Sequence, residues 1–210
     1  YRMVRAVKNR FGAVNELAVF AMVDSGLKAI GNPSALFLNR QENPAPGSVT
    51  MATWEGTRPM LVEIQALVDP NNSPQPRRVV IGYDSNRLAL LLAVMHRFLN
   101  CPMHRHDVFV NVVGGLRIQE TAADLAIVMA LYTSMRKKTM PADYLVFGEI
   151  GLSGEIRPVA QGEARLIEAR KQGFTHAWIP KGNRLHQKTK CGNLQMNLLC
   201  HIKDILSCSK

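Results

Sequence analysis

The order of hydrophobic and polar positions predicts strands and helices that alternate along the chain. Residues 62–68 place Val, Ile, Ala and Val at every second position, the period-two pattern of a strand with one buried face. Shorter apolar runs predict further strands at residues 15–23, 79–81, 108–113, 144–147 and 176–179. Pro180 follows the last of these runs, so we expect this to be the final strand.

Two helices are predicted from the residues at their ends. Asp84 or Ser85 can cap a helix that runs to about Leu99, with apolar residues at helical spacing inside it. A second helix over residues 162–172 stops at Gly173, since glycine is favoured just after a helix C-terminus.

A third helix is predicted between Ala122 and Met135. Thr121 and Asp124 stand at the spacing of a capping box, although Glu or Gln is the usual third-position partner. Residues 136–138, Arg-Lys-Lys, complement the dipole at the end of this helix. With no internal repeat or linker, the whole pattern predicts one α/β domain.

Proline and glycine mark the predicted turns. Residues 69–76 contain three prolines and predict an exposed loop. Gly148, Gly151 and Gly154 resemble a nucleotide-binding loop in spacing, but the Gly-x-Gly start and the following lysine are missing. A tight hairpin around residues 151–154 is therefore expected.

The composition favours a basic globular protein. Of 210 residues, 47% are hydrophobic, and the net charge is +10, which favours phosphate backbones, anionic membranes or acidic proteins as partners. No apolar run reaches the about 18 residues of a membrane-spanning helix, and the N-terminus lacks the pattern of a secretory signal. We therefore expect a cytoplasmic protein without a membrane partner.

The spacing of cysteine and histidine residues bears on metal binding. Four widely spaced cysteines contain no Cys-x-x-Cys pair, so a disulfide framework is not expected. Cys101, His104 and His106 lie close together, but a metal needs further convergent ligands and none is evident. A buried cysteine beside surface histidines is the preferred interpretation, and no metal site is predicted.

A catalytic pattern with missing catalytic residues occupies the second half of the chain. Residues 120–126 follow a glycine-rich turn, residues 147–155 read FGEIGLSGE, and Arg165 lies further on. This layout resembles the proteolytic domain of Lon proteases, with Ala122 in place of the nucleophilic serine and Arg165 in place of the lysine base. A methyl group cannot attack a carbonyl, and a guanidinium stays protonated, so the resemblance implies the fold without proteolysis.

A second resemblance rests on several motifs in order. Lys8, Asn9, Arg10, Phe11 and Gly12 read KNRFG, followed by matching stretches at residues 58–68, 76–78, 82–88 and 110–115. Together they resemble the bacterial RadA (Sms) family of recombination proteins, from about residue 1 to residue 180. The family's KNRFG motif supports ATP-driven DNA translocation, where Lys8 and Arg10 are expected to reach a nucleotide's phosphates.

The family resemblance implies a domain layout and a set of cofactors. Residues 1–14 are expected to be a connector from a missing ATPase domain, and residues 15–210 a Lon-like domain akin to ribosomal protein S5 domain 2, with residues 184–210 unassigned. The chain has no P-loop motif, and we expect no cofactor in it. ATP and Mg are expected for the missing ATPase domain, and Zn for a missing N-terminal zinc finger.

Arginines are the predicted DNA contacts, because their planar fork suits phosphate. For any single arginine, a solvated surface position is the plainer interpretation. The set predicted to contact DNA is Arg58, Arg77, Arg78, Arg87, Arg105 and Arg117. Aromatic residues make up 6% of the chain, so we expect electrostatic binding that is indifferent to base sequence.

These observations lead to one main hypothesis and two alternatives. The chain is predicted to be the DNA-binding and ring-assembly domain of an ATP-dependent translocase or helicase in homologous recombination, branch migration and DNA repair. Its expected partners are single-stranded or branched DNA, five further copies in a hexameric ring, and a recombinase filament. The alternatives are an active Lon-type Ser-Lys peptidase and a purely structural oligomerisation domain.

Overall fold

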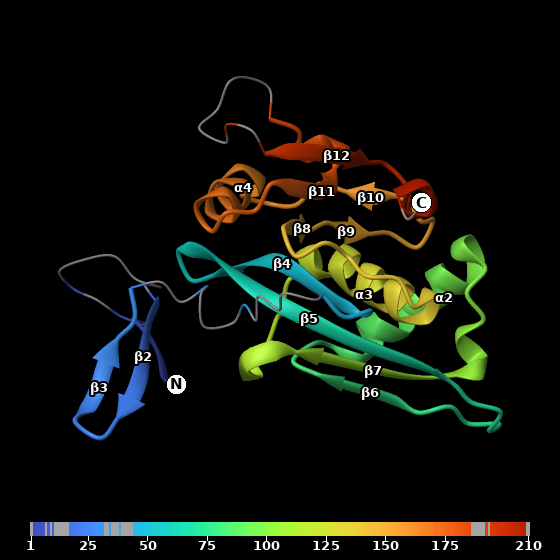
Figure 1. Ribbon diagram of the computed structural model, residues 1–210, viewed down its shortest axis with the longest axis horizontal. Coiled ribbons are helices and arrows are strands. Elements are labelled where there is room, and N and C mark those ends of the chain that lie inside the picture. Colours follow the sequence, from blue (N-terminus) through green and yellow to red (C-terminus); the bar gives the residue numbers. More distant parts are fainter. Residues whose placement is uncertain are drawn as a thin grey trace.

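The computed structural model describes residues 2–6, 8, 10, 17–31, 34, 38, 44–185, 192 and 194–208. Its main body is a seven-stranded mixed sheet (Figure 1). In sheet order the strands are β12 (Gln195–Leu199), β11 (His176–Pro180), β8 (Tyr144–Val146), β4 (Ser48–Glu55), β5 (Arg58–Pro70), β7 (His106–Val112) and β6 (Arg78–Ile81). β5 is antiparallel to both β4 and β7, whereas β6 is parallel to β7, and β8, β11 and β12 run parallel to β4. The α/β prediction is confirmed.

Helices pack on both faces of this sheet. α2 (Ser85–Leu99) and α3 (Asp124–Arg136) share one hydrophobic core with Met51, whereas the next residue, Ala52, packs into a second core with α4 (Gly162–Lys171). Successive side chains of a strand point to opposite faces, so α4 lies on the face opposite α2 and α3. α3 is buried at every position from Asp124 to Ser134, which makes it the central helix of the domain.

The alternating pattern of β5 holds for only half of the strand. From Ile64 onward, buried residues alternate with exposed ones, and Leu67 is 58% exposed. Leu61 and Glu63, on the opposite face, are buried, so the prediction of a single buried face was wrong there. Leu61 is buried on this second face because α4 packs against it.

The ends of two helices test the predicted caps. The carboxylate of Asp84 accepts a hydrogen bond from the N–H of Arg87 at 2.7 Å, which confirms Asp84 as the cap of α2. The predicted capping box before α3 was wrong. A short 3-10 turn, η3 (Thr121–Ala123), precedes α3, the Thr121 hydroxyl donates to Glu149, and Asp124 is hydrogen-bonded to other elements. Tertiary partners for both side chains displaced the local cap.

The C-terminal segment adds a strand that the sequence did not reveal. β12 pairs in parallel with β11, so the prediction that residues 176–179 form the last strand was wrong. The 3-10 turn η5 (Ile202–Asp204) and α5 (Ile205–Cys208) follow, and the side chains of Ile202 and Ile205 are fully buried. β12 reads QMNLL, without the β-branched residues that mark a strand, because its partner strand and its packing decide its conformation.

A small separate sheet precedes the main body. β1 (Arg2–Arg5), β2 (Leu17–Val23) and β3 (Gly26–Ala29) form it, and Figure 1 shows it standing beside the seven-stranded sheet. β1 pairs with β2 across position 14, where the sequence placed a domain boundary, and that boundary stays a prediction. Of the KNRFG motif, Lys8 and Arg10 are exposed, and Asn9, Phe11 and Gly12 lie outside the described residues.

Two smaller features complete the fold. β9 (Glu149–Ile150) and β10 (Ile156–Arg157) pair as an antiparallel hairpin, which confirms the predicted turn at residues 151–154. Residues 72–75 are exposed, as predicted for the proline-rich loop. Among the helices that the structure describes, none is long and apolar enough to cross a membrane.

Candidate functional site

Ala122 lies in the turn that leads into α3, and its side chain is buried. The N–H of Gly148 donates to the carbonyl of Ala122 at 2.9 Å, and the N–H of Leu125 donates to the carbonyl of Gly148 at 3.0 Å. These two backbone bonds tie the start of α3 to the segment before β9. The two stretches singled out in the sequence, 120–126 and 147–155, therefore meet in space.

Arg165 reaches the same turn from α4 and is only 1% exposed. Its Nη1 and Nη2 donate to the two carboxylate oxygens of Glu120, at 2.9 and 2.6 Å. Nη1 also donates to the carbonyl of Ala52 at 2.5 Å, and Nε to the carbonyl of Ala160 at 3.1 Å. The guanidinium is thus a buried structural cation, and its carboxylate partner Glu120 lies two residues before Ala122 in the chain.

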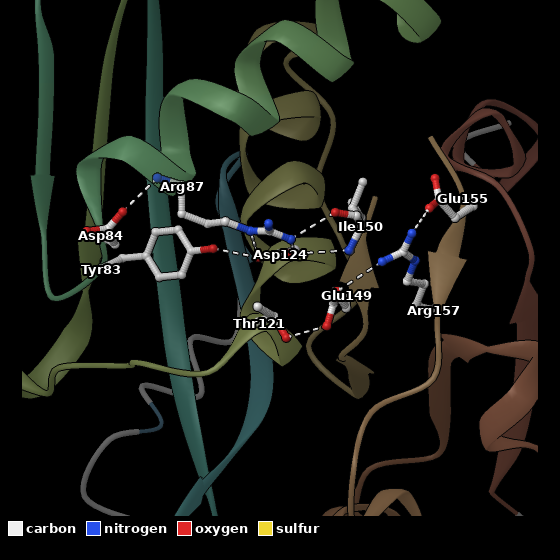
Figure 2. Close-up of polar contacts among 9 residues, drawn as sticks. All are labelled: Tyr83, Asp84, Arg87, Thr121, Asp124, Glu149, Ile150, Glu155 and Arg157. Atoms are coloured by element: carbon white, nitrogen blue, oxygen red, sulfur yellow. Dashed lines mark hydrogen bonds and ion pairs between the residues drawn. The ribbon is translucent and has the colours of Figure 1, made fainter. Parts of the chain in front are cut away.

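A second ion pair joins Arg87 to Asp124, which lies two residues after Ala122 in the chain (Figure 2). Asp124 is completely buried, and its carboxylate accepts hydrogen bonds from the Tyr83 hydroxyl at 2.5 Å, the Ile150 N–H at 3.0 Å and the Arg87 guanidinium. Nη2 of Arg87 also donates to the carbonyl of Ile150 at 2.9 Å. This network joins the starts of α2 and α3 to β9.

Protonation in this network follows from burial and charge. Burial and, after it, the negative charge of Asp124 raise the pKa of the Tyr83 hydroxyl. The hydrogen bond to Asp124 raises the pKa of Arg87. Tyr83 therefore stays a neutral donor and Arg87 a cation at neutral pH, which suits a permanent structural link.

The chemistry available around Ala122 is limited. The neighbouring Thr121 hydroxyl donates to Glu149 at 2.6 Å, and Arg157 lies 3.8 Å from that carboxylate while also pairing with Glu155 (Figure 2). Because Glu149 is paired with Arg157, its carboxylate is a weak base for deprotonating the Thr121 hydroxyl. Position 165 holds an arginine, so it provides no lysine base at this turn.

Ser134 and Ser153 are serines in this half of the chain, and Ser134 has a structural role. It is 9% exposed, and its hydroxyl accepts a hydrogen bond from the N–H of Val68 at 3.0 Å. Ser153 lies in the β9–β10 hairpin, away from the turn before α3. Neither serine is placed beside Arg165 or Ala122 by the contacts of the structure.

Three of the six predicted DNA-binding arginines meet at one end of the sheet. Arg77 and Arg78 lie at the start of β6, and Arg105 lies in the turn η1 (Met103–Arg105), just before β7 begins. β6 and β7 are parallel, so both start at the same end. The Arg77 side chain is 75% exposed, with Asp107 beside it, whereas the Arg78 guanidinium donates to the carbonyls of Met103 and His106.

The end of α3 brings more cations to the same place. Val68, near the end of β5, is hydrogen-bonded to Ser134, so α3 finishes above the end of β5, which is where β6 and β7 start. The exposed side chains there, which we call the basic end, are Arg77, Arg78, Arg105, Arg136, Lys137 and Lys138. From the sequence, residues 136–138 were predicted only to complement the dipole of the helix. Their run of three basic residues after a helix was the one signal that could have placed them in a cationic surface.

The other three predicted arginines lie elsewhere. Arg87 is held by Asp124, as described. Arg117 is exposed at the opposite end of β6, since the N–H of Ile118 donates to the carbonyl of Gly82 at 2.8 Å. Arg58 begins β5, about 40 Å from the end of that 13-residue strand. DNA contact by these three stays a prediction, and they do not share a surface with the basic end.

The cysteine and histidines considered for metal binding have other partners. Nδ1 of His106 lies 2.9 Å from the carbonyl oxygen of Pro102. Cys101 is fully buried, and burial raises the pKa of its thiol to about 11, which disfavours the thiolate that a metal needs. In the part of the chain that the structure describes, no three His, Cys, Asp or Glu side chains gather as metal ligands.

The site thus belongs to an α/β domain in which two arginine–carboxylate pairs, each with one fully buried partner, hold the start of the central helix. Residues 89–183, from α2 to the turn after β11, match a family described as subunit ChlI of Mg-chelatase. This match covers the turn at Ala122, the β9–β10 hairpin and α4.

Curated relatives match much more of the chain. It is 60% identical over 182 residues to the DNA repair protein RadA of Pseudomonas aeruginosa, which is 87% of this chain and 40% of the relative. It is 55% identical over 183 residues to the DNA repair protein RadA of Escherichia coli, which is again 87% of this chain and 40% of the relative. For the one from Haemophilus influenzae the identity is 52% over 207 residues, or 99% of the chain and 45% of the relative. The chain belongs to the RadA family and spans less than half the length of these relatives.

Proposed function

We propose that this chain holds DNA for a RadA-type repair protein, and that the basic end is where single-stranded or branched DNA lies. The observation that carries the proposal is the convergence of exposed cations from three separate elements on one end of the sheet. Cationic side chains on one face attract the phosphate backbone and release its counterions.

The local charge balance supports this placement. Six arginine and lysine side chains lie at the basic end, against Asp69, Asp107 and Asp143 among the neighbouring residues. Asp107 partly neutralises Arg77, from which it is 3.9 Å away. An excess of positive charge remains, so binding should be strong at low salt and indifferent to sequence.

The wider role follows from the family resemblance. In this proposal the chain assembles with further copies as a hexameric ring in an ATP-dependent DNA translocase or helicase, acting in homologous recombination, branch migration and repair. A ring multiplies weak phosphate contacts into useful avidity. ATP, Mg and Zn are proposed for other domains. In this chain, only Lys8 and Arg10 of the KNRFG motif are proposed to approach a nucleotide's phosphates.

The geometry favours this proposal over peptidase activity. Arg165, at the position that the Lon resemblance assigns to the base, is saturated by Glu120 and two carbonyls. The third hypothesis, a structural oligomerisation domain, predicts rings that do not bind DNA. Measuring DNA affinity and assembly on the same sample separates it from the main proposal.

The test is charge reversal at the two ends of the sheet. Arg77→Glu with Lys137→Glu removes two cations from the basic end, and Lys181→Glu with Arg184→Glu makes the same charge change beyond the end of β11, at the opposite end. We measure binding of fluorescent single-stranded DNA across a salt series.

The first pair should flatten the log-log salt slope by about 1.4, because each single-strand phosphate contact contributes about 0.7. The second pair should leave the slope close to that of the unmodified chain. Equal losses in both pairs would mean that net charge, and not the basic end, governs binding.

A further inference from the structure

A cavity of about 540 Å³ opens at the basic end, between the end of α3 and the strands β8 and β11. Its volume falls in the range of about 300–1,000 Å³ that is usual for small-molecule sites. Three aromatic and two basic residues lie in its wall, beside methionine, threonine and proline. The lining residues that the argument uses are Tyr132, Tyr144, Trp178, Lys137 and Lys138.

Aromatic rings form an ordered group at this cavity. The Tyr144 ring stacks on the imidazole of His176, with centroids 4.5 Å apart and planes 4° apart. The Trp178 indole meets the Tyr144 ring edge-on at 6.2 Å. The guanidinium of Arg136 lies 5.6 Å from the centre of the Tyr132 ring, which lines the cavity.

Trp178 carries an unsatisfied hydrogen-bond donor. Its side chain is 5% exposed, and its buried Nε1 has no hydrogen-bond partner among the described residues. A buried indole N–H usually finds an acceptor, because leaving a buried donor unpaired is destabilising. A ligand with a carbonyl or ring-nitrogen acceptor, seated against Trp178, is the kind of partner that this donor lacks.

The cavity adjoins the path proposed for DNA. β8 is parallel to β4, and β4 is antiparallel to β5, so β8 begins at the end of the sheet where β5 finishes. Tyr144 is the first residue of β8, and exposed Lys137 follows the last residue of α3. Lys137 therefore belongs both to the basic end and to the lining of the cavity, in position to contact a phosphate while a base enters the cavity.

We propose that this cavity binds one unstacked base of single-stranded nucleic acid, with its phosphate beside Lys137. A base has the flat π-face that Tyr144 and Trp178 suit, and it carries acceptors for the indole N–H. Stacking tolerates any base, which fits binding indifferent to sequence. The inference rests on the proposed DNA binding and adds to it a contact that phosphate attraction alone does not provide.

The experiment uses Trp178 as its own reporter. The chain has two tryptophans, and Trp54→Phe leaves Trp178 alone. Trp54 lies near the far end of β4, away from the cavity. This variant is titrated with oligo-dT and with an abasic oligonucleotide of equal length and charge, while anisotropy reports binding and intrinsic fluorescence reports on Trp178.

Oligo-dT should bind at least about fivefold more tightly than the abasic strand and should quench Trp178, since one stacked base contributes that much or more. Tyr144→Leu should remove the preference and leave the abasic affinity unchanged. Phe109→Leu, a matched aromatic change on β7, should keep the preference.

Each other outcome has a definite meaning. Equal binding of both strands with no change in Trp178 emission would overturn the base pocket and leave DNA binding at the basic end intact. Absence of binding to either strand would overturn the proposed function itself. Quenching by an aromatic peptide but not by oligo-dT would assign the cavity to a protein partner and refute the inference.

Discussion

Replacement of Arg165 by lysine tests whether this position is structural. Lysine is the residue that the Lon resemblance expects there, so a catalytic view predicts a harmless or activating change. The structure predicts the opposite. Arg165 makes four hydrogen bonds, to both oxygens of Glu120 and to two backbone carbonyls, while 1% exposed.

The magnitude follows from the geometry of the two side chains. Lysine presents a single nitrogen, which can hold the ion pair with Glu120 but not span the four acceptors that the guanidinium fork reaches. Losing two of these bonds, at about 1–2 kcal/mol each, should lower the free energy of unfolding by about 2–4 kcal/mol.

Urea unfolding followed by circular dichroism measures this loss directly. Arg170→Lys, an exposed change on the same helix, is the matched control and should shift stability by less than about 0.5 kcal/mol. If Arg165→Lys unfolds within about 0.5 kcal/mol of the unmodified chain, the hydrogen bonds seen at this position do not hold the fold as argued.

Three further predictions follow from the same contacts. Ala122→Ser combined with Arg165→Lys should cleave no casein, because the N–H groups of Ala123 and Leu125 beside this turn already donate to backbone carbonyls and are not free for an oxyanion; turnover above the parent chain would refute this. Hydrogen bonds from Asn71 and the Arg77 N–H lower the pKa of Asp107, so its stabilisation, complete above about pH 4, should be lost at lower pH. Asp107→Asn should therefore reduce the difference between the urea midpoint measured at pH 7 and that measured at pH 3. If this difference stays unchanged, Asp107 does not contribute to the loss of stability at low pH. Arg78→Ala should destabilise the fold by about 1–2 kcal/mol through its lost carbonyl contacts, whereas Arg77→Ala should leave the urea midpoint unchanged and weaken DNA binding; the reverse pattern would contradict the assignment.

The sequence predicted those features that depend on neighbouring residues. Asp84 caps α2 because its carboxylate needs only the N–H three residues on. The β9–β10 hairpin follows from closely spaced glycines, of which Gly154 has a φ of +84° and leaves no room for a side chain beside His201. Both signals act within a few residues, so no knowledge of the tertiary fold was required.

Features made by distant residues escaped prediction. Glu120 and Arg165 are 45 positions apart, and nothing in either segment identifies the other as its partner. Thr121 and Asp124 looked like a local cap until Glu149, Tyr83 and Arg87 offered stronger tertiary partners. The six predicted arginines do not share one surface, and the sequence could not show this. Only the directions of the strands reveal which arginines lie at the same end of the sheet.

The measurement that tests the central claim most directly is single-stranded DNA binding by this chain at rising salt concentration. The account predicts clear binding at low salt that weakens linearly on a log-log plot, with a slope that Arg77→Glu and Lys137→Glu reduce and that Lys181→Glu and Arg184→Glu do not. Absence of binding at low salt, from a folded chain, would contradict the claim that the basic end holds DNA.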